Sequence, residues 1–102
     1  MPDNADADVI RLNKEMTISH RDFFRILPGA LGTDDFRIDG HRITAGAGDR
    51  RLEIILSPET RRRVALLTLP VTHVSLEFVG YGAEQAAAAL ARFNRAFQRG
   101  GG

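Results

Sequence analysis

The chain has 102 residues, of which 43% are hydrophobic and 26% charged, and its formal net charge is +1. This composition fits one globular domain with a core of its own, and the near-neutral charge argues against strong nucleic-acid binding. The absence of cysteine excludes disulfides, thiolate catalysis, and zinc or iron–sulfur sites held by cysteine. There is no run of about 18 apolar residues, so we expect no membrane span and no membrane partner.

Residues 1–8 ("MPDNADAD") form the first distinct segment. Three aspartates and the lack of any periodic apolar pattern predict a disordered acidic tail. The segment has no apolar stretch typical of a secretory signal, and with no cysteine in the chain we expect a cytoplasmic protein. Residues 9–99 contain no repeat and no linker long enough to divide them, so they are predicted to form a single α+β domain.

A strand and a short helix are the first predicted elements. Apolar residues alternate in "VIRLNKEMTIS", which is typical of a half-buried strand. Ser19, followed three residues later by Asp22, matches a capping box at a helix start. Because a proline disfavours helical geometry at the residue before it, Pro28 predicts an early end of this helix, with Gly29 and Gly32 at its exit.

Several strands follow, separated by turn signals. Asp39-Gly40 in "FRIDGHRIT" predicts a type I′ hairpin that pairs Ile38 with His41. "SPET" at 57–60 predicts a second turn, between "RLEIILS" and "RRRVALLTLP". Pro70 is then expected to separate the latter strand from "VTHVSLEFVGY", because proline cannot donate a hydrogen bond to a strand ladder.

The segment "AEQAAAALARFNRAFQR" predicts a long helix with an apolar stripe on one side and arginines on the other. Glycines follow at 100–102. Glycine just past a helix end commonly adopts the left-handed C-cap conformation, so Arg99-Gly100 is interpreted as a helix stop followed by a short tail. The alternative is a carrier protein with a reactive C-terminal Gly-Gly, but in ubiquitin-like carriers the two glycines follow a strand.

The predicted element order is strand, helix, about four strands, helix. Two amphipathic helices need an apolar sheet face to cover, and hairpin-linked strands build an antiparallel sheet. We therefore predict an α+β fold with a single curved antiparallel sheet of about five strands and two helices on one face. In this element order, β-α-β4-α, the chain resembles a TATA-binding-protein repeat and a reduced helix-grip fold. The resemblance implies an arrangement of elements and no function.

No segment matches a catalytic or cofactor-binding motif. "HRD" at 20–22 lacks the asparagine that a kinase catalytic loop has five residues after the aspartate, and is interpreted as a helix N-terminus. "GAGD" at 46–49 lacks the lysine and the helix of a phosphate-binding loop and is interpreted as a loop between strands. His20, His41 and His73 are expected on different elements and match no metal-binding spacing. We therefore expect no cofactor, no metal site and no enzymatic activity.

The sheet face opposite the helices is the predicted binding surface. Mixed charges around some apolar area suit a polar protein interface, and we expect an accessory or adaptor protein that binds another protein there, with a homodimer as one form. His73 and Glu77 share this face but are about 13 Å apart along their strand, and whether a neighbouring strand supplies a third polar group is left open. The residues expected on the face are Arg37, Arg42, Glu53, Ile55, His73, Ser75 and Glu77.

A run of arginines, Arg61, Arg62 and Arg63, is the second surface feature. Such a run protects a strand end from aggregation, or it contacts an anion or an acidic partner. A hairpin would place it at the opposite end from Arg50 and Arg51. The alternative function is a weak phosphate-contacting nucleic-acid binder that uses these arginines and those of the last helix, although no aromatic pattern for base stacking accompanies them. A carrier with a Gly-Gly tail and a small enzyme are further alternatives.

Overall fold

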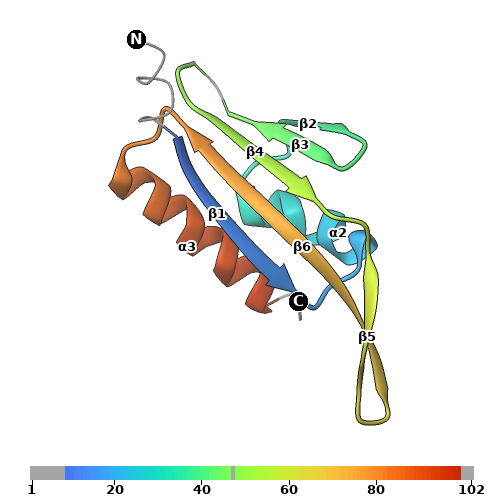
Figure 1. The fold of residues 1–102 in the computed structure, drawn as a ribbon. Coiled ribbons are helices and arrows are strands. Elements are labelled where there is room, and N and C mark those ends of the chain that lie inside the picture. Colours follow the sequence, from blue (N-terminus) through green and yellow to red (C-terminus); the bar gives the residue numbers. More distant parts are fainter. Residues whose placement is uncertain (1–8, 47, 100–102) are drawn as a thin grey trace.

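The computed structural model describes residues 9–46 and 48–99, whose arrangement is shown in Figure 1. The predicted acidic tail at 1–8 and the glycines at 100–102 lie outside the described residues. In chain order the elements are β1 (Val9–Met16), α2 (His20–Leu31), β2 (Phe36–Asp39), β3 (Arg42–Ala45), β4 (Arg51–Leu56), β5 (Thr60–Val64), β6 (Leu67–Val79) and α3 (Ala83–Arg99).

The strands form one antiparallel sheet with the order β1-β6-β4-β3-β2. The long strand β6 is central, because it pairs with β1 along one edge and with β4 and β5 in succession along the other. Both helices lie on the same face of the sheet, and no helix or strand of the described residues covers the other face, which we call the uncovered face (Figure 1). The predicted α+β class, with an open antiparallel sheet and two helices, is confirmed. Five strands rather than four lie between the helices, because "RRRVALLTLP" contributes to two of them.

The hydrophobic core lies between the sheet and the helices. The two helices meet through aromatic rings: the Phe23 ring centroid lies 4.9 Å from that of Phe97 and 6.3 Å from that of Phe93. Each fully buried side chain of this size contributes about 2–3 kcal/mol. Alternate positions of β4 and β6 face these rings, as the period-two pattern predicts. The buried residues on these two strands include Leu52, Ile54, Leu56, Val74, Leu76 and Phe78.

Capping groups mark the start of both helices. Ser19 is extended, and its Oγ accepts a hydrogen bond from the Asp22 N–H at 3.1 Å, as predicted. At the start of α3, the Gln85 side chain accepts from the Gly82 N–H at 2.9 Å, while the Gly82 carbonyl accepts from the Ala86 N–H. Gly82 is therefore the N-cap of α3, a position that no pattern in the sequence indicates.

The predicted end of the first helix at Pro28 is wrong. α2 continues to Leu31, so Gly29 lies inside the helix, and the C-cap is Gly32 with a left-handed φ of 73°. A proline inside a helix removes a hydrogen bond and strains the preceding turn. Leu27, which precedes the proline, is fully buried against the core, and we attribute the continued helix to this packing.

The β2–β3 hairpin is present, but its turn lies one residue later than predicted. Asp39 still belongs to β2, and Gly40 and His41 form the two-residue loop. Gly40 has a φ of 63°, whereas His41 does not have a positive φ. This is the pattern of a type II′ turn, which needs glycine only at its first position. The shift pairs Ile38 with Ile43 rather than with His41, and so brings two apolar side chains to the same face of the sheet.

The predicted turn at "SPET" is instead a β-bulge. Leu56 pairs with Val74 and Thr60 pairs with Val71, so residues 57–59 of one strand face only two residues of β6. The chain therefore passes from β4 to β5 along the same edge of β6 without reversing. A proline is tolerated in such a bulge because the ladder is interrupted there.

Beyond the bulge, β5 and the first part of β6 form a two-stranded hairpin that projects from the body of the molecule (Figure 1). We call residues 60–71 the arm. Val64 pairs with Leu67, so Ala65 and Leu66 form the two-residue turn at its tip. The arm accounts for the elongated shape, with extents of 52 × 27 × 25 Å.

Pro70 lies inside β6 and does not separate two strands, which corrects the prediction of an interruption there. It pairs with Arg61, three pairs from the turn. In a hairpin with a two-residue loop, hydrogen-bonded and non-bonded pairs alternate from the closing pair, and this count makes Arg61–Pro70 a non-bonded pair. The proline nitrogen therefore points to the edge away from β5, where no N–H is needed, in agreement with the expected edge position.

Candidate partner-binding face

The uncovered face presents alternate residues of every strand in the body of the sheet. The seven residues predicted for this face all lie on it, six of them in two rows that cross the sheet. One row contains Arg37, Thr44, Glu53, Glu77 and Arg11, and the other contains Asp39, Arg42, Ile55, Ser75 and Asn13. His73, the seventh, lies in the next row opposite Glu15 of β1.

Glu53 is the electrostatic centre of this face. Its carboxylate accepts a hydrogen bond from Arg42 at 2.7 Å and lies 3.1 Å from the Arg51 guanidinium, and its side chain is only 18% exposed. Glu77 lies directly opposite Glu53 on β6, and like charges at such positions repel each other. Arg11, 3.3 Å from Glu77, compensates the second carboxylate. The face therefore carries paired charges of both signs rather than an excess of one sign.

Strand β1 contributes three polar residues that were missing from the predicted site. Arg11 is one, and the Asn13 side-chain oxygen accepts a hydrogen bond from Ser75 Oγ at 2.8 Å. Glu15 pairs with Arg62 of the arm. The alternation in "VIRLNKEM" already places these side chains opposite the core, so the signal was available. What the sequence did not reveal is that β1 lies next to β6.

His73 and Glu77 each have a separate partner on β1, which answers the question left open by the sequence. His73 Nε2 lies 3.9 Å from a Glu15 oxygen, while Glu77 is paired with Arg11. The two residues therefore contact different side chains of β1 and form no dyad with each other. This arrangement presents polar and charged side chains of both strands to a partner.

Two of the three histidines come together, although they belong to different segments. The rings of His20 and His41 meet edge to face, with centroids 4.9 Å apart. His20 Nε2 also lies 2.7 Å from the Ser57 carbonyl oxygen, and its backbone N–H donates to Glu59 at 2.9 Å. His20 thus links the start of α2 to the bulge at residues 57–59. In the part of the chain that the structure describes, no three histidine, aspartate or glutamate side chains are grouped to hold a metal ion.

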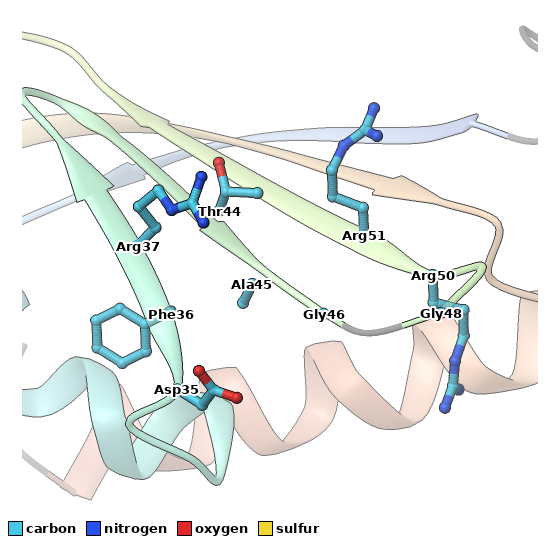
Figure 2. A pocket seen from close by; sticks show the side chains of 9 residues that line it. All are labelled: Asp35, Phe36, Arg37, Thr44, Ala45, Gly46, Gly48, Arg50 and Arg51. Atoms are coloured by element: carbon cyan, nitrogen blue, oxygen red, sulfur yellow. The ribbon is translucent and has the colours of Figure 1, made fainter.

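A hollow of about 390 Å³ lies where β2 begins and β3 ends, beside the "GAGD" loop. Figure 2 shows that two of the arginines lining it, Arg50 and Arg51, point in opposite directions. Arg51 is paired with Glu53, and the Arg50 guanidinium lies over the Tyr81 ring, 5.4 Å from its centroid. Arg50 and Arg51 therefore do not converge on one point in the hollow.

The arginines of the predicted anion-binding run all lie on the arm. Arg61 and Arg63 face one side of the hairpin and Arg62 faces the other. They are far from Arg50 and Arg51, at the opposite end of β6, as expected. The cause of this separation differs from the predicted one. The prediction paired the two strands in a hairpin, whereas β5 follows β4 along β6 and does not pair with it.

Comparisons of this chain with protein-family models, with curated proteins and with solved structures find no match.

Proposed function

We propose that this chain is a small non-enzymatic accessory protein that binds another protein through the uncovered face of its sheet, with a homodimer as one form of that binding. The main support is the location of seven candidate residues, with their ion-pair partners, on one surface that neither helix covers.

The electrostatics of the face support a selective contact. Arg42 and Arg51 are held by a partly buried Glu53, so their charges are oriented before any partner arrives. Preoriented charges of both signs favour a complementary partner and penalise others. Ile55 is a half-buried apolar residue between Arg42 and Ser75, which provides an apolar contact at the middle of the surface.

A matched pair of arginine substitutions tests this proposal. Arg37 is an exposed residue on the uncovered face, and Arg95 is an exposed residue on α3. Neither has an ion pair among the described residues, so Arg37→Glu and Arg95→Glu carry the same charge change with little expected effect on folding. We expect Arg37→Glu to reduce partner binding at least about tenfold, because charge reversal at an interface introduces repulsion.

The measurement has two parts. Affinity purification from lysate of the native host, quantified by mass spectrometry, should recover a protein with the unmodified chain and with Arg95→Glu but not with Arg37→Glu. Light scattering of the purified chain reports self-association directly. A monomer whose recovered proteins are the same for all three chains would contradict the proposal.

A further inference from the structure

The tip of the arm exposes large apolar side chains that do not pack in the core of the domain. Leu66 is 96% exposed, Leu67 61% and Val64 46%. Ile38, at 51%, is the other exposed large hydrophobic residue among those described, and it lies elsewhere, on the edge strand β2. None of the tip residues belongs to the hydrophobic core. A concentrated apolar patch at the end of a projecting element is typical of a contact site.

The arm also carries a net positive charge, which lies on its strand β5. Residues 60–71 contain Arg61, Arg62 and Arg63 and no acidic residue. Arg62 pairs with Glu15 of β1. Arg61 and Arg63, on the other side of the hairpin, have no ion pair among the described residues. A surface that complements the arm must therefore be negatively charged and must also accept apolar side chains.

The arginines argue against a second copy of the chain as the occupant. Arm-to-arm pairing along the outer edge of β5 would bring the arginines of both copies together, and charged side chains on an edge strand oppose such pairing. Nucleic acid is also disfavoured as the occupant, because the arm contains no aromatic residue on which a base could stack. In addition, Arg11, Arg42 and Arg51 of the neighbouring face are already paired with glutamates.

The spacing along the arm matches the layers of a lipid bilayer. At about 3.4 Å per residue, Arg63 lies roughly 7 Å and Arg61 roughly 14 Å behind the turn. Apolar residues of interfacial proteins enter the boundary between headgroups and acyl chains by about 5–10 Å. When the tip is inserted to this depth, Arg63 lies at the level of the lipid phosphates and Arg61 just outside them.

We propose that the arm docks on the surface of a bilayer that contains anionic lipid, with Leu66 and Leu67 inserted and with Arg61 and Arg63 against the lipid phosphates. The chain would lie on the membrane and not span it, so the proposal departs from the expectation of no membrane partner, which rested only on the lack of a spanning segment. Neither described helix is long and apolar enough to cross a bilayer. This inference is independent of the proposed protein contact, because the arm tip and the uncovered face are separate surfaces.

A single tryptophan tests the insertion directly. The chain contains no tryptophan, so Leu66→Trp in the full chain creates one reporter at the tip. We expect its emission to shift to shorter wavelength with vesicles of phosphatidylcholine and phosphatidylglycerol, and to be quenched by brominated acyl chains. Vesicles of phosphatidylcholine alone should give a much weaker response, and added salt should reverse part of the binding.

Vesicle sedimentation with matched variants separates the two contributions. Leu66→Ser with Leu67→Ser should weaken binding about tenfold or more, while Ile38→Ser, an exposed apolar residue elsewhere, should not change it. Arg61→Gln with Arg63→Gln should weaken binding about 30-fold, since each basic residue near an anionic surface contributes about fivefold. The control is Arg21→Gln with Arg95→Gln, two exposed arginines on the helices, and it should bind like the unmodified chain. All of these positions are exposed, so circular dichroism should show that every variant is folded.

Three results would overturn the inference. The first is that the tryptophan emission does not change at millimolar anionic lipid. The second is equal binding to neutral and anionic vesicles that is indifferent to the arginine substitutions. The third is salt-dependent binding to duplex DNA in the absence of vesicle binding, which would assign the arm to nucleic acid. None of these results bears on the Arg37→Glu experiment, so the two proposals can fail separately.

Discussion

Thr72 is a buried polar side chain in a core that is otherwise apolar. It is 0% exposed, and its Oγ1 donates a hydrogen bond to the Ile18 carbonyl at 2.9 Å. Valine has nearly the same shape but no hydroxyl, so Thr72→Val leaves a buried carbonyl without this donor. We expect the free energy of unfolding to fall by about 1–2 kcal/mol, measured by urea denaturation followed by circular dichroism.

The same substitution at Thr60 is the control for Thr72→Val. Thr60 Oγ1 also donates to a strand carbonyl, that of Val71, but over 3.3 Å and from an exposed position on the arm. Water can replace this hydrogen bond, so Thr60→Val should change the free energy of unfolding by less than about 0.5 kcal/mol. Equal losses at the two positions would show that burial of the Thr72 hydroxyl is not the reason for its effect.

Alternation within each strand was enough to assign individual residues to the two faces of the sheet. It placed Glu53 and Ser75 on the uncovered face and Leu76 in the core, as the structure shows. It could not assign partners, because the Arg11–Glu77 ion pair joins residues from opposite ends of the chain. The Gly40-His41 turn was missed for a related reason. Local turn signals favoured Asp39-Gly40, but the register follows the pairing of Ile38 with Ile43.

At the scale of elements, β5 is expected to be the least stable strand of the sheet. All five of its residues are exposed, and the hydrophobic core includes no residue from it. β4 pairs with the same strand β6 but buries Leu52, Ile54 and Leu56. Segments without buried contacts open locally, whereas core strands exchange only when the whole domain opens.

Hydrogen exchange followed by NMR measures this difference. We expect the amides of Arg62 and Val64 on β5 to exchange at least about a hundredfold faster than the amide of Ile54, relative to their unfolded-chain rates. Ile54 is an internal control, because β4 lies between β3 and β6 and its N–H therefore points to a neighbouring strand, whichever side it faces. Equal protection would mean that the arm is packed against another surface, as in a self-associated form of the chain.

The elements with a strong periodic pattern were the ones that could be predicted. α3 and β4 are clear in the sequence because their apolar residues repeat at helical and strand periods. The turn of the arm could not be found in this way, because "VALL" contains none of the glycine, asparagine or proline that mark most turns. Ala65 has a φ of 54°, a conformation that alanine seldom adopts. The apparent turn at "SPET" was a stronger local signal than the real one seven residues later.

At the scale of the whole molecule, the topology depends on contacts that no local pattern encodes. β1 and β6 pair with each other although most of the chain separates them in sequence, as in the pair Arg11 and Glu77. This pairing makes β1 the edge strand on one side of the uncovered face. The arm likewise exists because β6 is longer than β4 and continues beyond the body of the sheet. The two candidate surfaces therefore arise from a single strand, whose residues 72–79 lie in the body of the sheet and whose residues 67–71 lie in the arm.

The arm should dominate the overall dimensions in solution, which small-angle X-ray scattering can test. The radius of gyration is 14.5 Å, whereas a compact domain of about 100 residues has roughly 13 Å. Replacing residues 61–70 by Asn-Gly would close a type I′ turn on the hydrogen-bonded pair Thr60–Val71. Because both chains share every other residue, the difference between them reports on the arm alone, and we expect a decrease of about 1 Å or more with unchanged molecular mass. An unchanged radius would mean that the arm folds back onto the body, in which case Leu66 and Leu67 would not be available to any external surface.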